Sequence, residues 1–420
     1  MESLPDVLLQ VILSRVSDAR EVAACNCVSK RWNDSMAYIK ILCFPHNSFD
    51  NLCSTGESSG NIVRRMVSRV QQLERLIMYS PFSSADIESW LSIVGKSLRH
   101  LELRMDNVPN NRNICDKQTK LECIGAASNL ESLRLWGVLI LHSPKWNVFQ
   151  NLRNLELIDV QVEEYVLNSV LQSCPFVTRL LLIKCQGILS IAINLTYLEE
   201  CKLDIYGMGN CSFNLNSPLI ESLEVQGCSV IVVPQSNHLR HLSISNKAGR
   251  VYRVDFGNLP SLEFLSMRGI CWYWDAICKM LKLASEVKHL FMKVEFTGNF
   301  DTLQPFPEID FVDFFNNHKR LQKFDIHGAM FAALNQRNSV KNMNSGFVIP
   351  CLEEVVITVR SPLNAEQKMG TLQSLLKYGK NVKIMVIKIT QMKSTHWSVD
   401  EFFKQISWFK YMNRKIVRIE

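Results

Sequence analysis

The 420-residue sequence contains no run of eighteen apolar residues, and its N-terminal segment lacks the apolar core of a signal peptide. A membrane-spanning helix needs about 20 such residues, and a secretory signal peptide needs a shorter apolar core. We therefore expect neither membrane insertion nor export, and we expect an intracellular location in the nucleus, the cytoplasm or both. Hydrophobic residues make up 47% of the chain, which is ample for a large core.

Motifs for catalysis, metal binding and nucleotide binding are also missing. The sequence has no His-Glu-x-x-His, no Gly-x-Ser-x-Gly and no glycine-rich dinucleotide loop, and its nine histidines are dispersed. Gly95-Lys96-Ser97 resembles the end of a phosphate-binding loop, but Trp90 occupies the position of the first glycine. We therefore predict no catalytic residues, no metal ion, no cofactor and no intrinsic enzyme activity.

The fourteen cysteines are scattered singly, and Cys-x-x-Cys does not occur. Cys25 and Cys27 are the closest pair, and we expect both to lie in a core. This distribution is typical of buried thiols in a reducing compartment, since disulfide frameworks and zinc sites need regular spacings.

The net charge of +7 is concentrated near the C-terminus. Residues 368–420 contain 11 Lys or Arg against 3 Asp or Glu, and the rest of the chain contains 36 against 37. A polyanion such as nucleic acid is one partner that such a segment could attract. The basic residues alternate singly with apolar ones, as at Lys383 and Lys388, so we favour a solvated face of structured elements and expect no nucleic-acid binding.

The first forty residues predict short amphipathic helices. Pro5 suits the first turn of a helix, and Ser3 with Asp6 is placed to cap that turn. A second helix is expected to start at Asp18, with Glu21 at the capping-box position. The apolar stripes of these helices are wider than one core contact needs, and a module of about 40 residues rarely stabilises itself without a partner. This segment is therefore predicted to be a docking module.

Three segments in order, Leu4-Pro5-Asp6, VILSRV at 11–16 and VSKRW at 28–32, resemble the F-box over roughly residues 3–42. The resemblance implies docking onto a Skp-family adaptor and, through it, a cullin–RING ubiquitin ligase. The alternative is a helical cap that packs its apolar stripe on the next domain. The residues that the resemblance assigns to the adaptor contact are Leu4, Pro5, Val7, Leu8, Val11, Ile12, Val16, Val22, Cys25, Val28, Lys30 and Trp32.

An aliphatic phrase of the form Leu-x-x-Leu-x-Leu recurs thirteen times at intervals of 19 to 34 residues. Such a repeat predicts a leucine-rich-repeat solenoid, in which each unit buries its apolar face only by stacking on its neighbours. We predict an F-box at 1–45, an irregular solenoid at 60–390 and a basic C-terminal cap at 391–420. The phrases begin at Leu73, Leu98, Leu130, Leu152, Val177, Leu198, Ile220, Leu239, Leu262, Val287, Leu321, Leu352 and Val382.

Each phrase predicts one strand of a parallel sheet, with the connection returning as a helix or irregular coil on the convex side. Such helices are expected around Ile87–Val94 and Trp274–Leu281, where apolar residues recur at helical spacing, and the Trp272-Tyr273-Trp274 run is expected to pack on this side. The fold class is therefore α/β, a three-helix F-box followed by the solenoid. The repeat phrases and the segment LLKYGKNVKIMVIKIT resemble plant F-box/leucine-rich-repeat proteins.

Aligning the phrases gives a column of outward side chains on the concave face. An apolar island is expected at Trp136, Ile158, Leu181 and Ile183, with Arg134, Glu156, Arg179 and Lys202 at its rim. A second patch is expected at Phe264, Arg268 and Phe291, with His289 beside it. One interpretation is that these two patches bind a protein substrate. The alternative for the apolar island is that an insertion such as Met105–Thr119 covers it. The column is Tyr79, Arg104, Trp136, Ile158, Ile183, Asp204, Gln226, Ser245, Arg268, Lys293, His327, Thr358 and Lys388.

The function implied is that of a substrate-recognition subunit of an SCF-type ubiquitin ligase, with a protein substrate of unknown identity. One alternative is a non-catalytic solenoid interaction protein that acts outside ubiquitination. Another is a small-molecule receptor of the same architecture, which needs convergent Arg or Lys in a polar pocket; Arg104, Arg134 and Arg179 do not show such convergence. Two polar segments, 110–113 and 335–342, are expected to be surface loops.

Overall fold

The computed structural model describes residues 4–46, 48–49, 58–79, 82–105, 121–207, 209–296, 307–335, 346–361, 364–390 and 397–420. The chain divides into two compact units, Met1–Tyr206 and Gly207–Glu420, and each is treated by itself below. The predicted polar segment 110–113 and most of 335–342 lie outside the described residues, as does most of the predicted covering insertion.

The first unit begins with a small helical module. Pro5 occupies the position just before the first helix, one residue earlier than predicted, and the Asp18 side chain caps the second helix by accepting from the Arg20 N–H. Ser29 caps the third helix through the Trp32 N–H. The elements are α1 (Asp6–Leu13), α2 (Ala19–Asn26), α3 (Lys30–Ser35) and the short 3-10 helix η1 (Met36–Tyr38).

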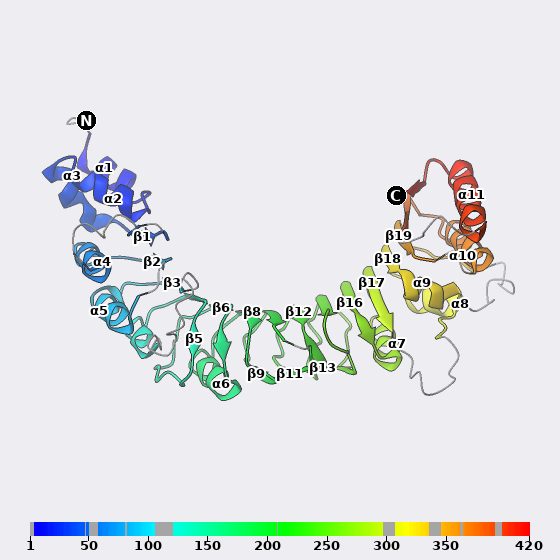
Figure 1. The fold of residues 1–420 in the computed structure, drawn as a ribbon, viewed down its shortest axis with the longest axis horizontal. Helices are drawn as coiled ribbons and strands as arrows, with labels where there is room; N and C mark the ends of the chain where they lie inside the picture. The colour runs from blue at the N-terminus through cyan, green and yellow to red at the C-terminus, as the bar shows by residue number, and fades with distance from the viewer. Residues whose placement is uncertain are drawn as a thin grey trace. The chain divides into compact units, whose positions relative to one another are not determined.

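A parallel sheet follows in the first unit, with strands in the order β1-β2-β3-β4-β6-β8-β10 (Figure 1). Equivalent residues of successive strands lie side by side, as where Arg134 pairs with Glu156 and Glu156 with Leu181. The strands are β1 (Ile41–Phe44), β2 (Arg75–Met78), β3 (His100–Arg104), β4 (Ser132–Trp136), β6 (Asn154–Ile158), β8 (Arg179–Cys185) and β10 (Glu200–Ile205).

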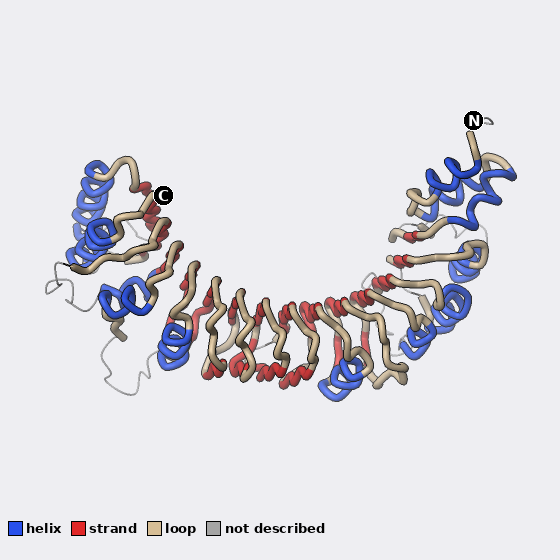
Figure 2. The backbone as a smooth tube through the Cα atoms, turned by 180° about the vertical axis from the view of Figure 1, so that it is seen from behind, coloured by secondary structure: helices blue, strands red, loops and turns tan. Residues whose placement is uncertain are grey.

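Helices cover one face of this sheet (Figure 2). The opposite face, called the open face below, receives every second side chain of each strand. The predicted helix at Ile87–Val94 is confirmed, because Ile87, Trp90, Leu91 and Val94 are all buried. The covering elements are α4 (Ser59–Val67), α5 (Ser84–Val94), the 3-10 helix η4 (Leu121–Ala126), α6 (Glu164–Gln172), β5 (Leu139–Ile140), β7 (Gln161–Val162) and β9 (Ser190–Asn194).

The second unit repeats this plan with a parallel sheet in the order β12-β14-β16-β17-β18-β19-β20-β21. Its helices are α7 (Trp274–Leu283), α8 (Phe311–Asn317), α9 (Gly328–Asn335), α10 (Ala365–Tyr378) and α11 (Trp397–Met412). The strands are β12 (Ser222–Gln226), β14 (His241–Asn246), β16 (Phe264–Trp272), β17 (His289–Phe296), β18 (Lys323–His327), β19 (Glu354–Val359), β20 (Ile384–Ile389) and β21 (Val417–Ile419).

Not every connection returns as a helix or coil, which corrects the prediction for the covering face. In the second unit β11 (Cys211–Asn216), β13 (Cys228–Val233) and β15 (Arg253–Phe256) form a second parallel ladder. Apolar and polar residues alternate along these segments, as in CSFNLN, whose burial alternates with the same period. A period of two buries one side of a strand, whereas a helix needs apolar residues three and four apart.

Each of the thirteen predicted phrases leads into one of the strands from β2 to β20. In the second phrase Leu98, Leu101 and Leu103 are essentially fully buried between the sheet and its covering layer. Full burial of one such side chain contributes about 2 kcal/mol. Strands β1 and β21 extend the parallel pairing beyond the predicted solenoid at 60–390. The domain bounds themselves stay predictions.

The aromatic run Trp272-Tyr273-Trp274 joins the end of β16 to the start of α7. Trp272 is fully buried at the end of β16, and α7 follows on the covering face with Ile277 and Met280 buried.

Among the described cysteines several are buried, but Cys27 is exposed and Cys25 is half-buried, so the predicted core position of this pair is wrong. Cys25 lies late in α2 and Cys27 directly follows it, whereas the buried residues of this short helix, Ala19 and Val22, lie in its first half.

Candidate partner-binding surfaces

The N-terminal helices expose an apolar surface. Val7, Leu8, Val11 and Ile12 of α1 are 68%, 50%, 49% and 46% exposed, and Val28 after α2 is 57% exposed. The opposite side of α1 packs inward, where Leu9 and Leu13 are almost completely buried. A helix with apolar residues on both sides has more apolar surface than the chain itself covers, which is the property of an interaction surface.

The remaining residues predicted for adaptor contact divide by exposure. Val22 is fully buried, because this side of α2 packs in the core of the module, so it stabilises the module and is not part of its surface. Pro5 and Lys30 are exposed, and the half-buried members are Leu4, Val16, Cys25 and Trp32.

An ion pair fixes the start of α1 against α3. The Arg31 guanidinium lies 2.5 Å from the Asp6 carboxylate and also donates to the Leu4 carbonyl oxygen. The helix that carries most of the exposed apolar surface is thereby held against α3. The Arg20 side chain lowers the pKa of the Asp18 carboxyl, because it donates to that carboxylate at 2.6 Å.

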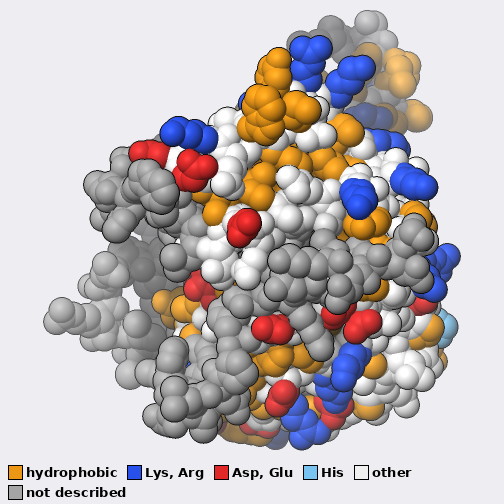
Figure 3. Space-filling view, turned by 90° about the vertical axis from the view of Figure 1, so that its right-hand side faces the viewer, with side chains coloured by type: hydrophobic (Ala, Val, Ile, Leu, Met, Phe, Trp, Pro, Cys, Tyr) orange, Lys and Arg blue, Asp and Glu red, His pale blue; other side chains and the backbone are white. Residues whose placement is uncertain are grey.

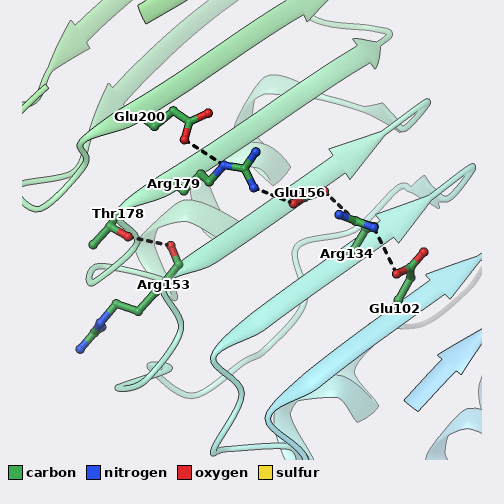
Figure 4. A network of polar contacts seen from close by, with 7 residues as sticks. All are labelled: Glu102, Arg134, Arg153, Glu156, Thr178, Arg179 and Glu200. Carbon is green, nitrogen blue, oxygen red and sulfur yellow. Dashed lines mark hydrogen bonds and ion pairs between the residues drawn. The ribbon is translucent and has the colours of Figure 1, made fainter. Parts of the chain in front are cut away.

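Charged side chains alternate across the open face of the first unit (Figure 4). Arg134 lies 3.2 Å from Glu102 and 2.6 Å from Glu156. Arg179 lies 3.3 Å from Glu156 and 3.0 Å from Glu200. We call this chain of five side chains the Glu–Arg ladder. Its central carboxylate, Glu156, is buried, and the pKa of Arg134 is raised because Glu156 accepts its hydrogen bond.

The predicted apolar island lies beside the Glu–Arg ladder, at the next outward position of the same strands. Trp136, Ile158 and Ile183 are half-buried, but Leu181 is only 7% exposed, so it belongs to the core. The Arg104 guanidinium lies over the Trp136 ring, 3.9 Å from its centroid, and thus covers part of the island. The role of the island in substrate binding stays a prediction.

In the second unit the open face contains a pocket of about 360 Å³ at the C-terminal ends of β16 to β19. Arg268 and Phe291, two of the residues predicted for substrate contact, lie together here, with the guanidinium 4.5 Å from the ring centroid. Phe264 lies at the other end of these strands, stacked on His241 at 4.2 Å and edge-on to His289. The predicted patch is therefore divided between the two ends of the strands.

A groove between α10 and α11 was not found from the sequence. Its volume is about 650 Å³, and Met369, Leu376 and Trp408 are among its lining residues. Trp408 and Tyr411 of α11 are 65% and 67% exposed. Figure 3 shows hydrophobic side chains gathered beside Lys and Arg in the upper part of this face, where the C-terminal helices lie. The spacing of Trp408, Tyr411 and Met412 along one helix is the pattern by which the sequence indicates this surface.

Within the described part of the chain, no group of three or more His, Cys, Asp or Glu is arranged to hold a metal ion. No described helix is both long and apolar enough to cross a bilayer. Lys383 is exposed and Lys388 is half-buried, in agreement with a solvated face, whereas Lys368 is buried in α10 and burial lowers its pKa to about 8.

Comparison with known proteins adds two kinds of similarity. Residues 1–38 match the family described as F-box-like. Over its whole length the chain is 57% identical to an F-box protein of Arabidopsis thaliana, covering all of both chains. It is also 24% identical over 306 residues to an Arabidopsis F-box/LRR-repeat protein, covering 69% of this chain and 70% of the relative.

Proposed function

The chain belongs to the F-box protein family, and we propose that it is the substrate-recognition subunit of an SCF-type cullin–RING ubiquitin ligase. In this proposal the N-terminal module docks on a Skp-family adaptor inside the cell, in the nucleus, the cytoplasm or both. The repeats hold a target protein within reach of the ubiquitin-conjugating enzyme. This chain contributes proximity and performs no chemistry itself, because a shared scaffold raises the effective concentration of the target.

The exposed apolar surface of α1 is the observation that supports this proposal most strongly. Leu8 and Ile12 lie one turn apart on the exposed side, and Val11 and Val7 broaden the surface. Exposing apolar side chains to water costs free energy. A partner that covers this stripe removes that cost. The Arg31–Asp6 ion pair keeps this stripe preformed, which reduces the entropy lost on binding.

The test is binding of the purified full-length protein to a purified Skp-family adaptor, measured by pull-down and calorimetry. We expect the wild-type chain to bind and the Leu8→Asp/Ile12→Asp variant to lose at least about a hundredfold in affinity, because two charges enter an apolar interface. Both side chains are about half exposed in the free chain, so the variant is expected to fold.

The matched control is Leu189→Asp, which places a charge on an apolar residue that is 79% exposed elsewhere in the same unit. It is expected to bind the adaptor as tightly as the wild type. The proposal fails if the wild type does not bind the adaptor, or if the double variant binds equally well. Adaptor binding without recruitment of a cullin subunit, measured by co-sedimentation, would favour the alternative role outside ubiquitination.

A further inference from the structure

The pocket on the open face of the second unit has a concentration of positive charge. Four of its lining side chains are basic, and Glu295 supplies a carboxylate to one of them through an ion pair with Arg360. Among the described residues, no carboxylate lies within ion-pair distance of Lys247, Arg268 or Lys293. We call this site the basic pocket; its basic residues are Lys247, Arg268, Lys293 and Arg360.

Strand register produces this clustering. Arg268 of β16 pairs with Lys293 of β17, so their Cα atoms lie on neighbouring strands about 4.8 Å apart. Met292 pairs with Ile326, which places His327 at the next strand in line with Lys293. Lys247 follows Asn246, the residue of β14 that pairs with Gly269. Arg268 and Lys293 therefore stand in one row, and Lys247 lies two residues beyond Ser245, the residue of β14 that pairs with Arg268.

The backbone around the basic pocket is fixed by specific contacts. The buried Asn246 side chain donates to the carbonyl oxygens of Gly209 and Cys228 at 2.8 and 3.1 Å, and it accepts from the Gly249 N–H at 2.8 Å. These bonds hold the turn that carries Lys247. Gly269 has φ +144°, and a Cβ there would lie 2.5 Å from the Asn246 carbonyl oxygen, so the pocket wall requires glycine at this position.

The pocket also has an apolar part. Phe291 lies under the Arg268 guanidinium and 5.4 Å from the His327 ring, and Ile270 is 55% exposed at the edge. Phe291 is held at both sides by these neighbours. A ligand for this site therefore combines negative charge with an adjacent apolar group, because either property alone leaves half of the lining without a complementary contact.

Two properties favour a peptide segment over a free small molecule. The pocket lining from Lys247 to His327 crosses four neighbouring strands, a span of about 14 Å, which exceeds a single small anion. An extended chain rises about 3.3 Å per residue, so four or five residues cover this distance with side chains that alternate in direction. Charged and apolar residues in alternation along such a segment would match the charged row and its apolar edge.

We propose that the basic pocket binds an extended acidic segment of the target protein. Carboxylates of the segment pair with Arg268 and Lys293, and an apolar side chain beside them packs on Phe291. This inference rests on the proposed function, because it takes the segment to belong to the protein that the ligase recruits. It assigns to the second unit the role of reading acidic sequence in the target.

The probe is a fluorescein-labelled twelve-residue peptide in which aspartate alternates with leucine and phenylalanine, added to the full-length protein and followed by fluorescence anisotropy. We expect it to bind the wild type, and its counterpart with asparagine in place of aspartate to bind at least about tenfold more weakly. Arg268→Gln/Lys293→Gln is expected to lose at least about tenfold for the acidic peptide, because two charge-assisted hydrogen bonds disappear.

The matched control is Lys288→Gln/Lys323→Gln, which removes the same charge from the opposite ends of neighbouring strands, where both lysines are paired with glutamates. This variant is expected to keep wild-type affinity. The proposal is overturned if the acidic and amide peptides bind equally, or if both double variants lose affinity equally.

Two further probes separate this proposal from other anions. If inorganic phosphate binds with dependence on Arg268 and the acidic peptide does not bind, the site belongs to small anions and the proposal is wrong. If a single-stranded oligonucleotide of twelve bases binds more tightly than the peptide, the site belongs to nucleic acid. The measurement contains no adaptor, so its outcome is independent of the pull-down that tests the proposed function.

Discussion

The open face of the first unit and the pocket end of the open face of the second unit use charge in opposite ways. In the first unit Arg134 and Arg179 alternate with three glutamates, so each guanidinium has carboxylates on both sides. In the second unit Arg268 and Lys293 stand side by side at paired positions of β16 and β17 without carboxylates of their own. The backbone is the same parallel sheet in both, so the difference lies in which residues occupy matching register positions.

This difference shows what a repeat sheet does with charge. Parallel strands bring equivalent residues to within about 5 Å, so opposite charges neutralise one another and like charges sum. A balanced row stabilises its own sheet and offers little field to a partner. An unbalanced row gains nothing within the chain and attracts a partner of the opposite sign. The comparison therefore separates a structural region from a recognition region.

The largest expected effect comes from making the first unit resemble the second. Glu156→Lys replaces the buried centre of the Glu–Arg ladder with a third cation between two arginines. We expect the first unit to lose about 3 kcal/mol of stability, since breaking a buried charge network leaves unpaired charges. Segment-resolved hydrogen exchange of β4, β6 and β8 measures this loss separately from the second unit.

Glu200→Lys is the control for that experiment, because it changes the same charge at the outer end of the ladder, where the side chain is 46% exposed. Its expected cost is only about 0.5 kcal/mol, as for exposed ion pairs. Equal losses in the two variants would mean that burial of Glu156 does not strengthen the ladder and would remove this part of the comparison.

The reverse change gives the second unit an alternating row. Lys293→Glu places a carboxylate between Arg268 and His327, so we expect binding of the acidic peptide to fall by at least about tenfold. Stability of the sheet is expected to stay the same or to rise by up to about 1 kcal/mol, because opposite charges then lie at paired positions. Anisotropy and hydrogen exchange of β16 to β18 report the two effects. Loss of binding together with loss of protection would indicate damage to the fold instead.

Much of this arrangement was predictable from the sequence. The thirteen apolar phrases located thirteen strands. Apolar residues that alternate with a period of two, repeated along the chain at intervals of 19 to 34 residues, are typical of the strands of a repeat solenoid. The outward column already placed Arg268, Lys293 and His327 in line. This column did not include Lys247 and Arg360. These two residues follow the ends of β14 and β19, so the turns after those strands bring them to the pocket.

Which side chains pair with one another, and which are buried, was harder to predict from the sequence. The sequence placed Arg134, Glu156 and Arg179 at the rim of an apolar island, whereas the structure joins them with Glu102 and Glu200 into the ladder. The choice depends on side-chain rotamers across strands, which no local pattern encodes. Val22 and Leu181 were likewise predicted as surface residues, since an apolar residue on an amphipathic element has the same appearance at an interface and in a core.

The smallest expected effect concerns acid. Burial lowers the pKa of His241, His289 and His318 in the second unit and of His100 in the first. A depressed histidine pKa means that unfolding takes up a proton below about pH 6.5, so the free energy of unfolding falls as the pH drops through that value. Each histidine contributes at most about 1.4 kcal/mol per pH unit, and the second unit has more of them. Hydrogen exchange at pH 7.0 and 5.5, corrected for the intrinsic rate, is expected to show a larger loss of protection in β14 and β17 than in β3.

The control is the His241→Gln/His289→Gln variant, which is expected to reduce this difference between the two units. Equal losses of protection in the two units of the wild type would mean that these histidines do not set the acid sensitivity of either unit.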